Sequence, residues 1–104
     1  MDLFENVKVE KNANVYFDGK VTSRNIFFTD GTKKTLGVML PGTYEFGTEK
    51  KEIMEIQSGS LKVLLQEETE WMDIKGGTSF EVSANTKFKL EVLELTDYCC
   101  SYID

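Results

Sequence analysis

The chain has few residues that could perform nucleophilic, acid–base or metal chemistry. It contains no histidine and only two cysteines in 104 residues. Cys99 and Cys100 are adjacent, which is poor geometry for a disulfide, and no histidine or second cysteine pair completes a zinc site. A cysteine nucleophile would also lack its histidine base. Because neighbouring strand residues point to opposite faces, we expect at most one of the two thiols to be buried.

Glu52 is the carboxylate with the most informative position. It alternates with Met54 and Ile56, so all three share one face of an expected strand. A carboxylate on an apolar face should not be buried without a partner or a purpose. We therefore take Glu52 as the candidate catalytic residue. The alternative is a rim residue paired with Lys50 or Lys20.

Aromatic and polar side chains at other inward strand positions could complete a binding site. The same parity places Tyr44, Phe46 and Thr48 on one face of their strand. An apolar and aromatic cup with few polar groups is the usual makeup of a small-molecule pocket, although inward aromatics also serve as plain core. The candidate ligand contacts are Tyr44, Phe46, Thr48, Met54, Trp71 and Phe88.

The elements that must position these residues are strands. Period-two alternation is interrupted by glycine-bearing turns, and no segment has a convincing helical pattern. About nine short strands in one domain, 1–104, predict an all-β sandwich or closed barrel of antiparallel strands. The segment 50–65 predicts two antiparallel strands joined by a turn at Ser58 and Gly59. The other strands are expected at 16–23, 25–29, 34–40, 43–48, 71–74, 79–82, 88–95 and 98–103.

Charge and hydropathy argue against two classes of partner. The net charge is −6 and Arg24 is the only arginine, whereas a nucleic-acid-binding protein needs a basic face. No apolar run approaches the roughly 20 residues of a membrane helix. The first residues are acidic and lack the apolar stretch of a secretory signal, so we expect a cytoplasmic protein.

Two segments resemble the conserved motifs of the cupin superfamily, whose fold is a small jelly-roll barrel. The matching positions are Gly42, Glu52 and Gly59 in the first segment, and Gly77, Ser83, Asn85 and Phe88 in the second. The metal-binding histidines of that pattern would fall at about Phe46, Thr48 and Phe88, and none of these is histidine. Glu52 alone is not a metal site, so no metal is expected.

Read end to end, the chain resembles the short bacterial cupins known as pyrimidine/purine nucleoside phosphorylases. The resemblance implies a metal-independent homodimer without a cofactor. It implies phosphorolysis of diverse purine and pyrimidine nucleosides by inorganic phosphate, giving free base and ribose 1-phosphate. The segments that carry it are YFDGKV (16–21), LGVMLPGTYEFGT (36–48), EIMEIQSGSLKVLL (52–65), EWMDI (70–74), GTSFEVSANTKFKLEV (77–92) and YCCSY (98–102).

Phosphorolysis would assign a role to each group of candidates. A carboxylate such as Glu52 can favour the oxocarbenium-like ribose. Aromatic faces can grip any base, at roughly 1–3 kcal/mol for each stacked base. The cations on the early strands are Lys20, Arg24, Lys33 and Lys34, and Lys20 is the first candidate phosphate ligand because it lies in a family-like segment. Backbone amides at glycine turns are the alternative.

Residues 1–15 carry more apolar side chains than one small core needs, among them Leu3, Phe4, Val7 and Val9. We expect a two-fold dimer that uses this segment as an N-terminal arm or that uses a neighbouring sheet. Two other functions stay open from the residues alone. One is a non-catalytic cupin module that binds a small heterocyclic or apolar ligand, and the other is a structural dimerisation domain whose lumen is simply core.

Overall fold

The fold is all-β, as predicted. The computed structural model describes residues 2–104, which form two antiparallel sheets and one short 3-10 turn, η1 (Phe17–Gly19). No helix among these residues is long and apolar enough to cross a membrane. The larger sheet contains β1 (Lys8–Val9), β2 (Asn14–Tyr16), β3 (Val21–Phe27), β4 (Lys33–Met39), β6 (Lys51–Ser58), β9 (Thr78–Val82) and β11 (Thr96–Ile103). The smaller sheet contains β5 (Gly42–Gly47), β7 (Ser60–Leu65), β8 (Met72–Lys75) and β10 (Lys87–Val92).

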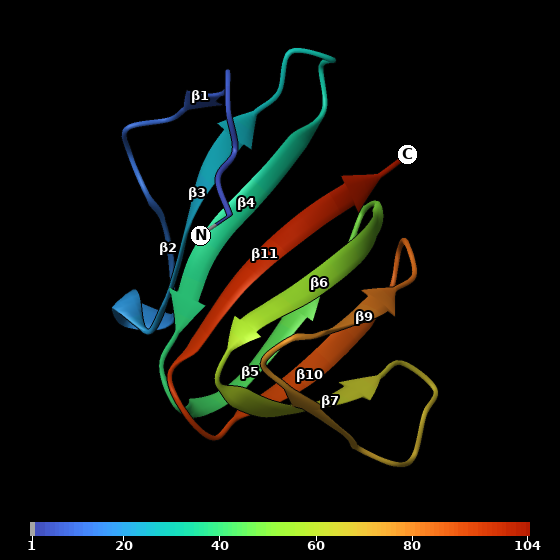
Figure 1. Cartoon of the computed structure of the whole chain (residues 1–104). Coiled ribbons are helices and arrows are strands. Elements are labelled where there is room, and N and C mark those ends of the chain that lie inside the picture. Colours follow the sequence, from blue (N-terminus) through green and yellow to red (C-terminus); the bar gives the residue numbers. More distant parts are fainter. Residues whose placement is uncertain (1) are drawn as a thin grey trace.

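The two sheets pack face to face. The larger sheet has the order β1-β3-β4-β11-β6-β9, with β2 also paired to β3, and the smaller has the order β5-β10-β7-β8. Figure 1 shows β11 (red) between β4 and β6, with β5, β7 and β10 behind them. Each sheet keeps its own hydrogen-bond ladder, so the described strands form a sandwich and are not joined into one closed barrel.

The strands on either side of Gly59 are present, but their predicted pairing is wrong. β6 pairs with β11 and β9 in the larger sheet, whereas β7 pairs with β10 and β8 in the smaller sheet. Only Gly59 separates β6 from β7, and a tight hairpin needs two turn residues. Gly59 has φ +104°, and a Cβ there would lie 2.5 Å from the carbonyl oxygen of Leu95. The glycine therefore lets the chain cross from one sheet to the other in a crowded corner.

The inward strand positions form the core, as parity predicts. Tyr44, Met54 and Phe88 are buried, and so is Leu90. The alternating residues Glu55, Gln57, Lys87 and Lys89 are exposed. Burial of one face of each sheet against the other therefore follows directly from the period-two pattern.

Both cysteines are buried, so the expectation of at most one buried thiol is wrong. Cys99 and Cys100 do point to opposite faces of β11, and their exposed fractions are 1% and 3%. Cys100 faces the other sheet. Cys99 lies under the N-terminal segment, where Phe4 packs edge-on against Phe28 with ring centroids 5.1 Å apart. Of the expected arm, Met1 lies outside the described residues, the segment 2–7 lines a groove together with Cys99, and β1 and β2 pair with β3 in the larger sheet.

Candidate functional site

A cavity of about 180 Å³ lies between the two sheets and contains Glu52. Glu52 is the one carboxylate among the described residues that line it. The larger sheet supplies most of the wall, and the smaller sheet supplies an aromatic side from β5 and β10. The lining residues are Tyr16, Ser23, Thr35, Met39, Phe46, Gly47, Glu52, Met54, Phe88, Tyr98, Cys100 and Tyr102.

The register of the larger sheet brings the polar groups together. Glu52 on β6 lies opposite Tyr102 on the central strand β11. One step further into the cavity, Cys100 lies between Met54 on β6 and Thr35 on β4. Because inward side chains of adjacent strands stand side by side, these pairs form two parallel rows across the sheet floor.

Glu52 is half-buried, and a thiol is its hydrogen-bond partner. The Sγ atom of Cys100 donates to Oε1 of Glu52 over 3.5 Å. Burial raises the pKa of the Glu52 carboxyl above its ordinary value of 4.5, while the Cys100 hydrogen bond and the charge of Lys33 act in the opposite direction. The sequence alternative of a rim pair is not seen, because Lys50 instead pairs with Asp104 at 2.6 Å.

Two tyrosines on β11 remain neutral beside this carboxylate. Burial raises the pKa of both Tyr98 and Tyr102, and the neighbouring Cys100 and Glu52 act in the same direction. The Tyr98 hydroxyl donates to the carbonyl oxygen of Thr22 over 3.3 Å, and the Tyr102 hydroxyl lies 3.4 Å from Oγ1 of Thr35. These phenols were not among the predicted site residues, although residues 98, 100 and 102 alternate and must share one face of a strand.

The smaller sheet contributes a stacked aromatic pair. The rings of Phe46 and Phe88 are stacked, with centroids 5.7 Å apart and an interplanar angle of 28°. Phe17 stands edge-on to Phe46 at 5.4 Å, and Tyr16 does so at 6.3 Å. Phe17 and Asp18 have φ values of +51° and +55°, which non-glycine residues adopt rarely. This uncommon turn places two aromatic side chains beside the cavity, and neither was among the predicted site residues.

Four predicted contacts lie away from the cavity lining. Tyr44 is buried behind it, with its hydroxyl donating to the carbonyl oxygen of Leu40 over 2.6 Å. Thr48 ties two loops together by donating to the carbonyl oxygen of Ser83 over 2.7 Å. Trp71 is 40% exposed just before β8, and Lys20 is exposed after η1. The structure therefore brings together Glu52, Phe46, Met54 and Phe88 from the predicted set.

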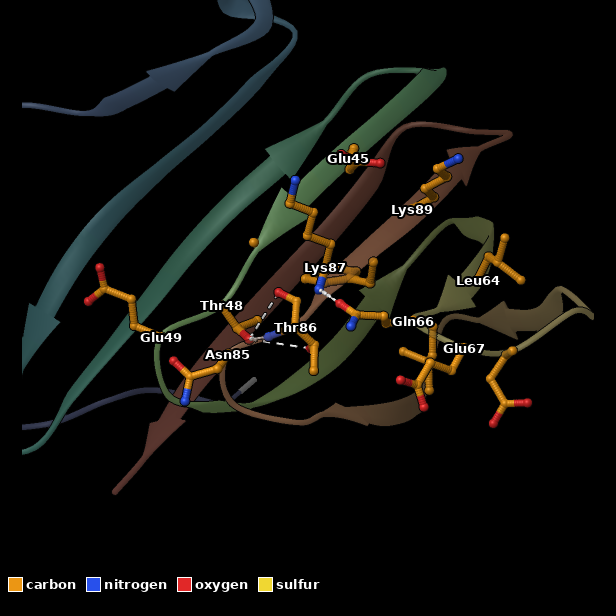
Figure 2. A pocket seen from close by; sticks show the side chains of 14 residues that line it. Glu45, Thr48, Glu49, Leu64, Gln66, Glu67, Asn85, Thr86, Lys87 and Lys89 are labelled. Carbon is orange, nitrogen blue, oxygen red and sulfur yellow. Dashed lines mark hydrogen bonds between the residues drawn. The ribbon is translucent and has the colours of Figure 1, made fainter.

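A larger groove of about 930 Å³ runs along the outside of the smaller sheet (Figure 2). Glu45 and Lys89 are exposed partners across β5 and β10, and the backbone N–H of Lys87 donates to Oε1 of Gln66 over 2.7 Å. Charges of opposite sign on an exposed sheet face are the usual solvated surface. The cavity between the sheets, with its half-buried carboxylate and aromatic pair, is the better candidate site.

The cavity opens into a second groove at the end of the sandwich where β6 begins and β11 ends. This mouth groove measures about 570 Å³ and shares Gly47, Glu52 and Tyr102 with the cavity. Its outer part is lined by Lys33, Lys50 and the turn 30–32. A substrate in the cavity could therefore meet a second reactant at Glu52.

No metal cluster is evident in the part of the chain that the structure describes. Within residues 2–104, no three side chains of the types His, Cys, Asp and Glu come together to hold an ion. Glu52 and Cys100 are the two potential ligands in the cavity lining.

The fold is cupin-like. A cupin superfamily protein from Desulfitobacterium hafniense has a similar structure, with a TM-score of 0.65 over 81% of this chain and 78% of that chain. Their sequences are 14% identical, so this likeness concerns the fold alone. A protein of unknown function from Acinetobacter sp. ADP1 is closer, with a TM-score of 0.94, 44% identity and coverage of 97% and 98% of the two chains.

The chain belongs to the pyrimidine/purine nucleoside phosphorylase family. The model of that family matches residues 11–102. A pyrimidine/purine nucleoside phosphorylase of Wolinella succinogenes is 60% identical over 103 residues, covering 99% of this chain and 98% of the relative. One of Hydrogenovibrio crunogenus is 60% identical over the full length of both chains. The family resemblance noted from the sequence is confirmed.

Proposed function

We propose that this protein cleaves purine and pyrimidine nucleosides with inorganic phosphate, releasing free base and ribose 1-phosphate. The observation that carries the proposal is the cavity between the sheets, where the Glu52 carboxylate lies in the wall formed by the larger sheet and the stacked Phe46 and Phe88 rings lie in the wall formed by the smaller sheet. Relatives that match the whole chain are named for this activity.

The reaction can be written with this cavity in view. An oxygen of hydrogen phosphate forms a bond to the anomeric carbon of the ribose as the bond from that carbon to the base nitrogen breaks. The electron pair of the broken bond stays on the base nitrogen, which accepts the proton that hydrogen phosphate gives up. Glu52 is proposed to stabilise the positive charge on the ribose and to bind its hydroxyl groups.

The aromatic wall suits a broad choice of bases. Phe46 and Phe88 offer ring faces, and stacking depends little on which base is bound. Tyr98 and Tyr102, kept neutral by burial, add hydroxyl groups that can bond to base or sugar. We propose that the base is held mainly through its faces, so that purines and pyrimidines are both accepted.

Three finer features belong to the same proposal. We propose that the two-sheet sandwich is an open form of the cupin-type jelly-roll barrel and that catalysis needs inorganic phosphate but no metal. We also propose a homodimer in the cytoplasm, in which the N-terminal segment contributes to the interface. Its support is the exposure of Leu3, of Val9 in β1 and of Val15 in β2, at 72%, 53% and 61%.

The test is release of free base from a panel of nucleosides: uridine, cytidine, inosine, adenosine, guanosine and xanthosine. Each is incubated with and without phosphate, and with a chelator. Phosphate-dependent release that the chelator leaves unchanged would support the proposal, and loss of release on chelation would refute metal independence. A protein that binds nucleosides without releasing base would instead be the non-catalytic module.

A further inference from the structure

We propose that Lys33 forms the phosphate-binding site at the mouth of the cavity, an inference that rests on the proposed function. Lys33 opens β4 and stands on the same face as Thr35 and Met39, both of which line the cavity. It also lines the mouth groove, together with Glu52 and Tyr102. A phosphate held there would lie beside the carboxylate that is proposed to face the ribose.

The sheet register places Lys33 in the same row as the reactive carboxylate. Ser101 on β11 pairs with Lys34 on β4, so the next residue, Tyr102, comes beside Lys33. Tyr102 is in turn opposite Glu52. The row therefore reads lysine, tyrosine, carboxylate across three adjacent strands, which spans roughly 10 Å at a strand spacing of about 4.8 Å.

A cation–π contact holds the ammonium group in this row. The Nζ atom of Lys33 lies 4.6 Å from the centroid of the Tyr102 ring. Such a contact orients an ammonium group without using up its charge-assisted hydrogen bonds. The charge of Lys33 also acts on Glu52, whose pKa it lowers, so the two groups are electrostatically coupled across the tyrosine.

The other lysines near the mouth are engaged with carboxylates. Lys50 pairs with Asp104 at 2.6 Å, and Lys51 pairs with Glu81 at 3.3 Å. Within residues 2–104, Lys33 has no carboxylate at ion-pair distance. It is therefore the cation at the mouth that can bind an incoming anion without first breaking an ion pair.

The acidic residues of the groove set a limit on the position of the anion. Asp30 accepts hydrogen bonds from the backbone N–H and the hydroxyl of Thr32, at 2.9 and 2.6 Å, and Asp104 is held by Lys50. Glu49 is exposed and precedes β6, which β11 separates from the Lys33 strand β4. The anion is thus expected close to the Lys33 ammonium and the inner part of the groove, away from the Glu49 side.

The decisive experiment varies phosphate at saturating nucleoside for the wild-type protein and for Lys33→Ala. We expect the KM for phosphate to rise about 10- to 100-fold, the loss typical of one charge-assisted contact, with a much smaller change in the KM for nucleoside. Lys33→Arg should recover most of the loss. Lys34→Ala is the matched control, because its side chain lies on the outer face over the Phe4 and Phe28 rings.

Lys20→Ala, measured in the same series, tests the sequence prediction for the phosphate ligand. If the KM for phosphate of Lys33→Ala stays within about twofold of the wild-type value, the proposed phosphate site at Lys33 is wrong, whereas the proposed phosphorylase activity is unaffected by this result. Phosphate binding is also measured by calorimetry on the same proteins, independently of turnover. Binding that Lys33→Ala loses would support the site even without base release, and no binding by the wild type would overturn it.

Discussion

Replacing Glu52 by glutamine isolates the charge of the proposed catalytic carboxylate. Glutamine keeps the size of the side chain and an oxygen that can accept from Cys100, whose thiol donates over 3.5 Å in the wild type. A unit charge about 4 Å from the carboxylate interacts with it by about 4 kcal/mol at an effective dielectric constant of about 20. If the ribose carries about half a charge in the transition state, the loss is about 2 kcal/mol, or roughly 30-fold in kcat.

Weaker hydrogen bonds to the ribose hydroxyls add to this loss. A hydrogen bond to a charged group contributes about 1.5–3 kcal/mol, and a neutral amide keeps only part of it. The expected fall in kcat is therefore about 30- to 1,000-fold, with a small change in the KM for nucleoside.

The assay is initial-rate release of base from uridine and inosine at saturating phosphate. Glu55→Gln is the matched control, since Glu55 is on the same strand but on the exposed outer face. It removes the same charge from the protein and should keep the wild-type rate. A Glu52→Gln protein that is folded, as judged by circular dichroism, and turns over within about threefold of wild type would refute the electrostatic role of this carboxylate.

Three further predictions follow from the same contacts. Phe46→Leu should lower kcat/KM by roughly 5- to 150-fold for purine and pyrimidine nucleosides alike, since about 1–3 kcal/mol of stacking is lost for any base. A loss in Phe46→Leu that is confined to one class of base would contradict this prediction. The control is Phe80→Leu, at a buried residue outside the cavity lining, which should lower the melting temperature and leave kcat/KM unchanged. Glu52→Gln should melt at a higher temperature than wild type, and the difference should grow as pH rises from about 4.5. Burial raises the pKa of the wild-type carboxyl, so the contribution of the protonated carboxyl to folding stability is lost as pH rises through that pKa. A difference in melting temperature that stays constant with pH would show that the carboxyl is not desolvated. Gly37→Ala should lower the free energy of unfolding by about 1–3 kcal/mol in denaturant titration, because a Cβ there would overlap the carbonyl oxygen of Thr22 and lie 2.9 Å from the Cα of Ser23. An unchanged midpoint of the denaturant unfolding curve would mean that β3 and β4 can move apart.

The all-β fold and the inward-facing positions of its strands could be predicted from the sequence. Alternation placed Met54 and Phe88 on inward faces, and both are buried because a strand exposes its two faces in turn to core and solvent. The same alternation singled out Glu52 as a carboxylate on an apolar face, and the cavity contains it. These features depend on one strand at a time, which is why local pattern suffices to predict them.

Strand pairing was beyond what local pattern can determine. The turn at Gly59 looked like a hairpin, but β6 and β7 belong to different sheets. Which strands become neighbours depends on contacts between distant segments, such as β6 with the C-terminal β11. For the same reason Cys99 is buried, since its cover comes from the N-terminal segment at the other end of the chain.

The amino-acid order alone was thus enough to predict the all-β class, the alternation of strand faces and the family. The expected strands 16–23 and 25–29 were wrong in detail, because η1 (Phe17–Gly19) interrupts the first and β3 (Val21–Phe27) runs through the expected break. Only the tertiary structure placed Glu52, Tyr102 and Lys33 at one mouth and left Lys20 and Trp71 away from the cavity lining. The physical reason is that a strand defines directions at a spacing of two residues, whereas a site is assembled from the register between strands far apart in the chain.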